Sequence, residues 1–457
     1  MKKMNKMLAA LLALMLTLTA CGMAFAEQEA RKIETAADAD EWIQMLFGEH
    51  PEELDSAWEL VPEVKTALDA AGGMKAVAMQ ITSIGEIKEI QPAYQKEIQG
   101  FQFFYIPCVF STMSVDIVLV TQDGAVAGIQ TGVFSGKQES ASSDLASVEL
   151  NLPVPSLGEL PGILTLPEGD GPFPAIVLVH GSGPNDMDET IFSVKPFKDL
   201  AEGLAAKGVA VYRYDKRTYT YGKELADNYQ LTLMEETVDD AAAAVQMLAQ
   251  QEKIDPERIY VLGHSLGGIA IPMIDKVLKE QPVAACGYVM MAGSPRKLDE
   301  LFREQYEFMF SVQAEAMEQA GMNKEDIFSE LDRLNDLDAL ADSDAIQGAY
   351  APYWKWLAEY DQLKMAEDIT KPVLVLQGEE DWQVTMKDFG IWQEAFGDKD
   401  NWTLISYPGL IHSMTHGVMN DVSMNYMRAE KVDEKVISDI AAFILEEKKK
   451  NTPPENR

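Results

Sequence analysis

The sequence predicts an α/β fold with a mainly parallel sheet, preceded by a small α+β domain. From about residue 145 onward, short apolar segments alternate with helical patterns, which is typical of a parallel sheet covered by helices on both faces. Before residue 137 the pattern differs, because helical spacing is followed by runs of aromatic and β-branched residues without that alternation. The length of 457 residues is enough for two or three domains.

Composition and charge exclude several classes of protein. A hydrophobic content of 47% with 25% charged residues is that of a globular chain and excludes wholesale disorder. The net charge of −36 repels phosphate backbones, so we expect no nucleic-acid partner. The three cysteines, Cys21, Cys108 and Cys286, are too few and too scattered for a disulfide framework or a cysteine metal cluster. No cofactor or metal is expected.

Residues 1–26 have the pattern of an export signal. Three lysines precede the apolar run from Met7 to Ala20, which is too short to cross a bilayer comfortably. The run LTAC that ends at Cys21 resembles a lipobox, whereas Ala24–Ala26 fits the small-x-small site of ordinary signal cleavage. Lipoproteins usually have a flexible polar tether after the cysteine, but here a helical pattern begins almost at once, at Ala36. This favours release, but both endings stay open. Membrane contact is expected only through the signal or a lipid anchor.

The α+β domain is expected over residues 27–136. Its helical half is followed by the strand-like runs Phe101–Phe110, Val115–Val120 and Ala125–Val133. The Asp123-Gly124 pair between the last two predicts a hairpin turn. Residues 137–144 are small, polar and aperiodic, so we expect a linker there.

The α/β domain is expected over residues 145–450, with an eight-stranded sheet. The strand candidates are Val148–Leu152, Gly162–Leu166, Ala175–His180, Val209–Tyr214, Arg258–Gly263, Gly287–Met291, Pro372–Gln377 and Trp402–Tyr407. Only turns separate the first two, so they should form an antiparallel edge. Residues 298–365 are acidic, rich in Met and helical throughout, which predicts a helical cap inserted between two strands. Residues 451–457 are expected to be a disordered tail.

The strongest chemical signal is the run GHSLG at residues 263–267. It lies between an apolar strand pattern and an apolar helical pattern, so Ser265 is predicted at a sharp strand-to-helix turn. Flanking glycines let the serine adopt a strained conformation that exposes its hydroxyl at a helix N-terminus. The run therefore predicts that Ser265 is a nucleophile. The alternative is a tight turn without a catalytic role.

The run HGSGP at residues 180–184 follows another strand. Acyl transfer needs two N–H groups directed at the developing oxyanion, and we assign these to Ser182 in this run and to Leu266 after the nucleophile. His180 and His264 are interpreted as structural.

An acid and a base are expected after the last two strands. The run GEEDWQV at 378–384 offers Glu379, Glu380 and Asp381 at the carboxyl end of a strand. His412 follows the final strand, where a base with a pKa near neutrality is still needed, and His416 competes with it. The order Ser265, Asp381, His412, each after its own strand, favours His412.

These motifs together resemble an α/β-hydrolase. The elbow, the run HGSGPNDMDE at 180–189 and Tyr214–Thr218 are similar to a bacterial carboxylesterase group with an HGSGP oxyanion loop, and the first domain resembles a module of unknown function found ahead of such enzymes. The resemblance covers about Leu150–Leu445 and departs from the group at Met187. It implies the α/β-hydrolase fold, and its G-x-x-D-x-x-V pattern favours Asp381 over its two neighbours as the triad acid.

We therefore expect an exported serine hydrolase. It should be a carboxylesterase whose substrate is a small-molecule ester with a small or medium acyl group. The sequence leaves the oligomeric state undetermined. Two alternatives remain: a peptidase or amidase on the same scaffold, and a non-catalytic envelope binding protein.

Two further clusters allow more than one interpretation. Asp186, Asp188 and Glu189 suggest a cation site, but carboxylates that open a helix are also favoured by its dipole. The cap residues Tyr353 and Trp356, with their aromatic neighbours, suggest either an acyl pocket or plain packing.

Overall fold

The structure is a computed structural model that describes residues 30–98, 101–111, 114–133, 145–155, 157–319, 321–422, 424–428 and 430–451. The predicted leader with Cys21, the predicted linker 137–144 and residues 452–457 of the predicted tail lie outside the described residues. The chain divides into two compact units, one up to Ser142 and one from Ser143, with the short segment Tyr426–Ala429 grouped with the first.

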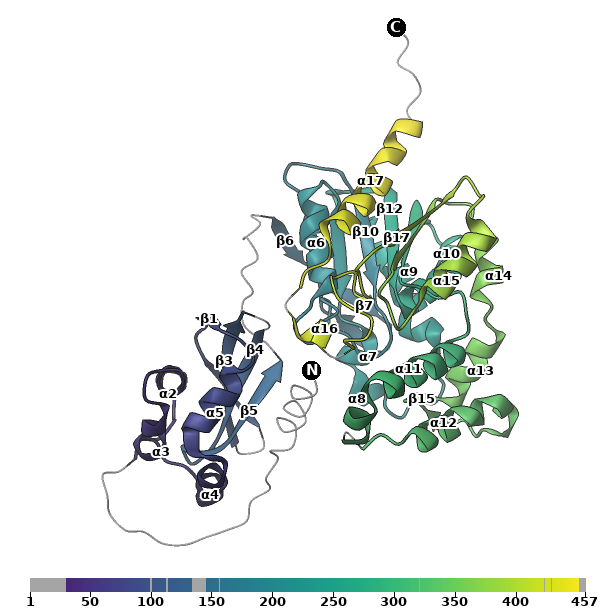
Figure 1. Cartoon of the computed structure of the whole chain (residues 1–457). Helices are drawn as coiled ribbons and strands as arrows, with labels where there is room; N and C mark the ends of the chain where they lie inside the picture. The colour runs from purple at the N-terminus through teal and green to yellow at the C-terminus, as the bar shows by residue number, and fades with distance from the viewer. Residues whose placement is uncertain are drawn as a thin grey trace. The chain divides into compact units, whose positions relative to one another are not determined.

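The first unit has helices followed by an antiparallel sheet (Figure 1). Its helices are α2 (Ala36–Leu46), η1 (Pro51–Glu53), α3 (Leu54–Ala57), α4 (Pro62–Ala71) and α5 (Gly73–Thr82). Its strands are β1 (Ile87–Ile90), β2 (Tyr94–Ile98), β3 (Phe101–Phe110), β4 (Ser114–Gln122) and β5 (Ala125–Val133). The sheet order is β1-β3-β4-β5, with β2 also paired to β3.

The three predicted strands of this unit are confirmed as β3, β4 and β5. Asp123 and Gly124 both have positive φ angles, of 51° and 84°, as a type I′ hairpin turn requires. Strands β1 and β2 were not predicted, because their short sequences IKEI and YQKEI carry too few apolar residues to show a strand pattern.

The second unit contains an eight-stranded sheet in the order β17-β16-β13-β12-β10-β11-β9-β6. Its strands are β6 (Ala146–Glu149), β9 (Gly162–Leu166), β10 (Phe173–Val179), β11 (Ala210–Tyr214), β12 (Ile254–His264), β13 (Gly287–Met291), β16 (Val373–Gly378) and β17 (Trp402–Tyr407). Strands β17, β16, β13, β12, β10 and β11 are parallel to one another. Strand β9 pairs antiparallel with both β11 and β6. The α/β class, the eight strands and the antiparallel edge are all confirmed, and β7 (Leu152–Val154) and β8 (Gly158–Leu160) form a separate small hairpin.

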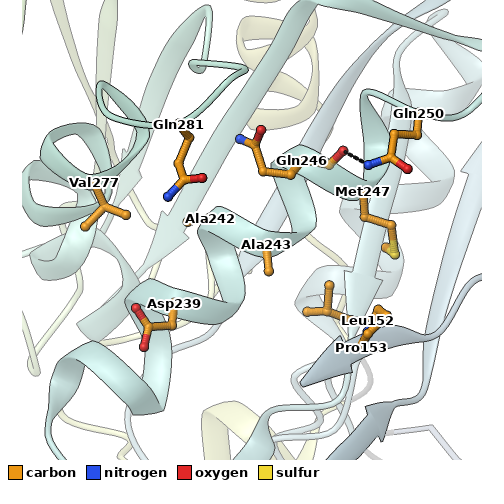
Figure 2. A pocket seen from close by; sticks show the side chains of 10 residues that line it. All are labelled: Leu152, Pro153, Asp239, Ala242, Ala243, Gln246, Met247, Gln250, Val277 and Gln281. Carbon is orange, nitrogen blue, oxygen red and sulfur yellow. Dashed lines mark hydrogen bonds between the residues drawn. The ribbon is translucent and has the colours of Figure 1, made fainter. Parts of the chain in front are cut away.

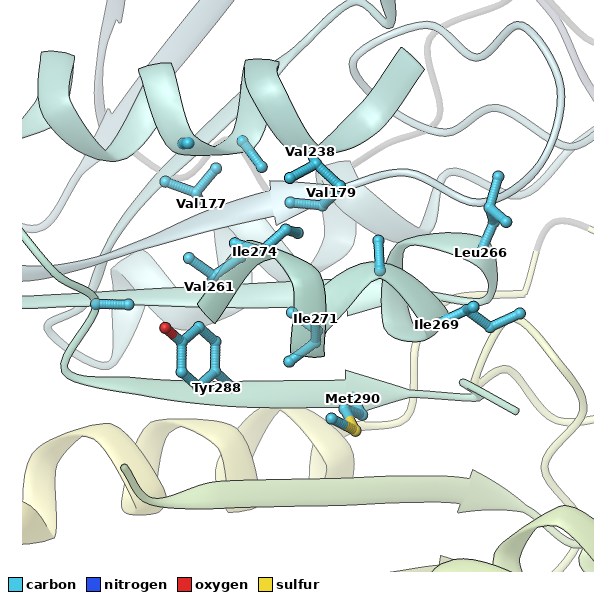
Figure 3. Close-up of a cluster of buried hydrophobic side chains, with 14 of the residues drawn as sticks. Val177, Val179, Val238, Val261, Leu266, Ile269, Ile271, Ile274, Tyr288 and Met290 are labelled. Carbon is cyan, nitrogen blue, oxygen red and sulfur yellow. The ribbon is translucent and has the colours of Figure 1, made fainter. Parts of the chain in front are cut away.

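Helices cover both faces of this sheet (Figure 1). Side chains alternate along β10, so that Ile176 and Leu178 pack with α6 (Pro196–Ala206) and α17 (Glu434–Asn451). On the opposite face the core lies under α9 (Asp239–Leu248), α10 (Leu266–Leu278) and α15 (Met386–Phe396), and Figure 3 shows its centre between the β-strands and α10. Burial of both faces explains why these strands read as continuous apolar runs.

The cap lies between β13 and β16 and is mostly helical, as predicted. It contains α11 (Leu298–Gln319), α12 (Lys324–Asp332), η3 (Arg333–Ala339), α13 (Ala351–Glu359) and α14 (Gln362–Ala366). The expectation that it is helical throughout was wrong, because β14 (Ala345–Ile346) and β15 (Ala349–Tyr350) form a small hairpin. Its turn residues Gln347 and Gly348 have positive φ angles of 49° and 78°, but a Gln-Gly pair is a weaker hairpin signal than Asn-Gly or Asp-Gly.

The second unit also contains the short helices α7 (Arg217–Thr220) and α8 (Gly222–Leu225) and the π-helical turn η2 (Met234–Val238). The short helix α16 (Met424–Met427) begins in the second unit and ends in the segment that is grouped with the first. Within the described ranges, no helix combines the length and the apolar character that crossing a bilayer requires.

Candidate active site

Ser265 lies at the predicted turn, directly between β12 and α10. Its φ of 53° and ψ of −114° lie outside the regions that L-residues ordinarily occupy. A Cβ atom on Gly263 would lie 2.1 Å from the carbonyl oxygen of Gly267, and one on Gly267 would lie 2.3 Å from that of Val179. Both flanking positions therefore exclude a side chain, and this close packing holds the strained backbone of Ser265 in place.

Asp381 follows β16 and is fully buried. Its Oδ1 accepts the backbone N–H groups of Gln383 (2.8 Å) and Val384 (3.0 Å). Its Oδ2 accepts hydrogen bonds from the side chain of Gln377 (3.0 Å) and from Nδ1 of His412 (2.7 Å). The carboxylate is thus fixed by donors on both oxygens and faces the predicted base.

The two rival carboxylates have other partners. Glu379 accepts a hydrogen bond from Ser406 Oγ at 2.8 Å, and Glu380 accepts one from the backbone N–H of Met419 at 2.9 Å. The geometry therefore favours Asp381 as the partner of the imidazole.

His412 lies on the loop after β17 and is only 4% exposed. Since Nδ1 is directed at Asp381, Nε2 is the ring nitrogen left for proton transfer. His416, the competing base, is on the surface and pairs through Nε2 with Asp433 at 2.8 Å. It has no contact with Asp381 among the described residues.

The loop that carries His412 is held against the turn that carries Ser265. His264 is the residue before the serine, and its Nε2 lies 3.0 Å from the carbonyl oxygen of His412. The two imidazole ring centroids are 4.7 Å apart. No hydrogen bond joins the hydroxyl of Ser265 to His412 within the described residues. Hydrogen bonds between a nucleophile and its base are often long without substrate and tighten in the complex with it.

The two predicted oxyanion donors lie on different elements. Leu266 is the first residue of α10, so its N–H has no acceptor within the helix. Ser182 is exposed on the loop after β10, where the side chain of Asn185 donates to the carbonyl oxygens of Gly181, Ser182 and Gly183 at 3.0 to 3.2 Å. A loop fastened through its own carbonyl groups keeps its N–H groups in a defined direction.

His180 and His264, which were interpreted as structural, each have a defined partner. His180 is buried, its Nε2 lies 3.0 Å from the carbonyl oxygen of Asp186, and burial lowers its pKa to about 4. Its neutral ring therefore donates to this carbonyl and braces the loop that follows β10.

Glu189 forms a buried contact that sequence analysis missed. Its Oε1 accepts the N–H of Gly181 at 2.6 Å, and its Oε2 lies 2.8 Å from Nδ1 of His264, close enough for an ion pair. Burial opposes both charges, but their mutual attraction outweighs it, so the pKa of Glu189 is lowered and that of His264 is raised. This carboxylate links the loop of residues 180–184 to the turn at Ser265.

The carboxylate cluster at residues 186–189 does not open a helix, which corrects the explanation based on the helix dipole, since α6 begins only at Pro196. Each carboxylate has its own partner instead: Asp186 accepts two hydrogen bonds from Thr190, and Asp188 pairs with Arg213 at 2.9 Å. In the part of the chain that the structure describes, no group of three His, Cys, Asp or Glu residues is arranged to hold a metal ion.

The cap aromatics are fastened by hydrogen bonds. Tyr353 donates to Glu236 Oε2 at 2.6 Å, Tyr360 donates to the carbonyl oxygen of Ile269 at 2.7 Å, and both side chains are buried. Trp356 packs on Tyr360 with ring centroids 5.1 Å apart. These contacts favour packing of the cap on the sheet domain, and not the lining of an acyl pocket, as the role of these aromatic side chains.

A cavity of about 470 Å³ lies along α9 (Figure 2). It is lined by Leu152, Pro153, Asp239, Ala242, Ala243, Gln246, Met247, Gln250, Val277 and Gln281. None of the predicted site residues lines it.

Comparison with known proteins identifies a family and a relative that match large parts of the chain. Residues 172–417 match the family described as serine aminopeptidase, S33. Over 364 residues the chain is 34% identical to Esterase EstD from Thermotoga maritima, which covers 79% of this chain and 84% of that protein.

Two solved structures are also similar to the chain. Puromycin hydrolase is 15% identical, with a TM-score of 0.46, and the match covers 79% of this chain and 48% of that one. Est1E from Butyrivibrio proteoclasticus is 16% identical, with a TM-score of 0.42, and the match covers 64% of this chain and 99% of that one.

Proposed function

Since the chain belongs to the serine aminopeptidase S33 family of α/β-hydrolases and is a carboxylesterase-like serine hydrolase, we propose that Ser265, His412 and Asp381 are its catalytic triad. The observation that supports this most directly is the buried hydrogen bond of 2.7 Å between His412 and Asp381, on a loop that is held against the turn of Ser265. A buried carboxylate on Nδ1 fixes the tautomer in which Nε2 accepts a proton.

The reaction follows from these positions. Nε2 of His412 takes the proton of the Ser265 hydroxyl as its oxygen attacks the ester carbonyl. The N–H groups of Ser182 and Leu266 stabilise the tetrahedral oxyanion. His412 then protonates the leaving alcohol, and a water molecule deprotonated by the same imidazole hydrolyses the acyl-enzyme, which restores Ser265.

We propose small or medium acyl esters as substrates. Support comes from the similarity to Esterase EstD, whose name describes an esterase, and from the cap that covers part of the sheet domain. A series of chromogenic esters with acyl chains of increasing length tests this. A steady rise in kcat/KM toward long chains would contradict it.

A fluorophosphonate probe, which phosphonylates activated serine hydroxyls, tests the triad directly. The wild-type chain should be labelled at Ser265, and the folded Ser265→Ala variant should not. Absence of label on the folded wild type would instead favour a non-catalytic binding protein.

A peptidase activity is a second candidate, because the matching family is described as serine aminopeptidase. Acyl transfer to water uses the same groups for esters and amides. Matched pairs of an ester and an anilide with the same acyl group discriminate between them. We expect the ester to have the higher kcat/KM, and a preference for anilides with a free N-terminal amine would reverse the assignment.

We also propose that the chain is exported by residues 1–26. The mass of the mature protein tests the two endings, since cleavage after Ala26 gives a chain that begins at Glu27, whereas lipidation gives one that begins with a modified Cys21. A Cys21→Ser variant should change the mature product only in the second case. A mature chain that keeps all 26 residues would contradict export by this segment.

A further inference from the structure

The direction of the Ser182 N–H depends on the carbonyl group of Gly181. These two groups belong to the same peptide unit, and this unit is trans. In a trans peptide the N–H and the C=O point in opposite directions. Whatever holds the oxygen of Gly181 on one side therefore decides where the N–H of Ser182 points on the other.

The oxygen of Gly181 is held by a buried cation. Lys216 Nζ donates to it at 2.8 Å, and Asn185 Nδ2 donates to it at 3.2 Å. On the preceding peptide, the N–H of Gly181 donates to Glu189 at 2.6 Å. Gly181 is thus fixed through both of its backbone polar groups.

Lys216 is only 2% exposed, so its charge needs compensation. Its ammonium group lies 2.5 Å from Oε1 of Glu236, in the π-helical turn η2. The other oxygen of Glu236 accepts the hydroxyl of Tyr353 from the cap helix α13. The ammonium is therefore held by a carboxylate that is itself fastened to the cap.

A buried ammonium on a peptide oxygen changes the donor on the other side of that peptide. It draws electron density toward the oxygen, which makes the N–H a stronger donor, and this effect is larger in a low-dielectric interior. An oxyanion hole works by such preorganised donors, which cost no reorganisation when the charge develops.

We propose that Lys216 is a positioning residue for the oxyanion hole, which orients and polarises the Gly181–Ser182 peptide so that the Ser182 N–H faces the developing oxyanion. Glu236 holds Lys216, and Tyr353 of the cap holds Glu236. The position of the cap is thereby coupled to the direction of the Ser182 N–H. The inference rests on the proposed function, because it assigns a role within the same site. It also gives a role to Lys216 in the run Tyr214–Thr218, on which the triad does not draw.

The alternative is that Lys216 only contributes a buried ion pair to stability. The next residue supplies a matched control, because Arg217 forms a comparable buried pair with Asp240, at 2.8 and 2.6 Å, and has no contact with the oxyanion loop among the described residues. Loss of either cation leaves one buried carboxylate behind, but only Lys216 contacts Gly181.

The experiment compares Lys216→Met and Arg217→Met in the full chain. Removal of one oxyanion donor typically lowers kcat by about 10²–10³-fold. Because Lys216 acts through such a donor, we expect a loss of roughly 10–100-fold in kcat with KM little changed. Arg217→Met should lose thermal stability to a similar extent and keep kcat within a few-fold of the wild type.

A trifluoromethyl ketone adds a readout that a structural role would not move. It forms a hemiketal with Ser265 whose oxyanion occupies the hole, so its affinity should fall by the same factor as kcat in Lys216→Met. If Lys216→Met does not fold, Lys216→Met with Glu236→Gln removes both charges and should show the same loss.

Two results would overturn the inference: a folded Lys216 variant with wild-type kcat, or equal losses of kcat in the Lys216 and Arg217 variants. Failure of the proposed function is recognised separately, because the wild type itself would then not be labelled at Ser265 by the fluorophosphonate.

Discussion

Nε2 of His264 lies 3.0 Å from the carbonyl oxygen of His412, so the residue before the proposed nucleophile holds the main chain of the proposed base. Nδ1 of the same ring faces Glu189, which in turn accepts the N–H of Gly181. One imidazole thus links the nucleophile turn and the base loop, and through Glu189 it reaches the oxyanion loop.

Replacement of Ser265 by alanine should abolish most of the esterase activity. We expect kcat to fall by roughly 10⁴–10⁶-fold, because triad residues act as a unit. Hydrolysis of a chromogenic short-chain ester measures the loss, and an unchanged melting curve shows that the variant is folded. A folded variant with the wild-type rate would refute the assignment of the nucleophile.

Asp381→Asn should lower kcat by about 10⁴-fold, because an amide no longer holds the imidazole in the productive tautomer. Glu380→Gln is the matched control: this side chain lies one residue away but accepts from Met419 instead of His412, so its kcat should change little. A larger loss in the Glu380 variant than in the Asp381 variant would reassign the acid.

His412→Ala should lose kcat by roughly 10⁴–10⁶-fold, since Asp381 orients its Nδ1 and leaves Nε2 for proton transfer, whereas both ring nitrogens of the neighbouring His264 face other partners. His416→Ala tests the rival histidine, which pairs with Asp433 at the surface, and should keep near wild-type kcat. Steady-state kinetics of both variants with the same ester decide between the two, and the reverse pattern would make His416 the base.

Asp199→Asn should stabilise the protein above about pH 6. Burial raises the pKa of Asp199 from 3.8 to about 6, so ionisation costs more in the folded than in the unfolded state. Asp199 therefore lowers the free energy of unfolding as pH rises from 3.8 to about 6. At 1.36 kcal/mol per pKa unit, the wild type loses at most about 3 kcal/mol over this range.

An asparagine oxygen can still accept the N–H of Val432, which Asp199 accepts at 3.2 Å. Urea unfolding of both proteins from pH 4 to pH 8 measures the difference. It should grow up to about pH 6 and then stay constant, and a variant that is less stable at pH 8 would contradict the expected sign.

Glu189→Gln should destabilise the protein most strongly between about pH 4.5 and 6.5. The lowered pKa of Glu189 gives stability above its unfolded value of 4.5, and the raised pKa of His264 gives stability below its unfolded value of 6.5. Both contributions are complete only between these values, where we expect a loss of roughly 1–3 kcal/mol.

The loss in Glu189→Gln should shrink as pH rises through the folded pKa of His264, because the neutral ring no longer pairs with the carboxylate of the wild type. Denaturant unfolding at pH 6 and at alkaline pH measures this. A loss of the same size at both would mean that the contact with His264 is not ionic.

Much of the fold could be predicted from local patterns. The strands of the main sheet are apolar runs because both faces are buried, and Asp123-Gly124 is a strong turn signal. The polar strands β1 and β2 and the hairpin at Gln347-Gly348 were missed, because their pairing depends on neighbours and is only weakly encoded in their own residues.

The candidate site could be predicted only as far as its motifs reach. Ser265, Asp381 and His412 each follow a strand of one parallel sheet, and carboxyl ends of parallel strands meet at one edge. Glu189 and Lys216 lie in the runs 180–189 and 214–218, which carry the family resemblance but assign neither residue a role. The available signal was position, since Lys216 closely follows β11 and Glu189 follows the oxyanion run, but position alone assigns no partner.

The sequence by itself determined the α/β class, the strained serine turn and the order of three reactive residues, because periodicity and glycine spacing act within a few residues of the chain. Only the tertiary structure decided which carboxylate faces the imidazole of His412. It also decided that the buried ammonium group of Lys216 donates to the carbonyl oxygen of Gly181, in the peptide unit that ends at the Ser182 N–H. Charge pairs of this kind join residues far apart in the chain, and their geometry exists only once the sheet and its loops have been brought together.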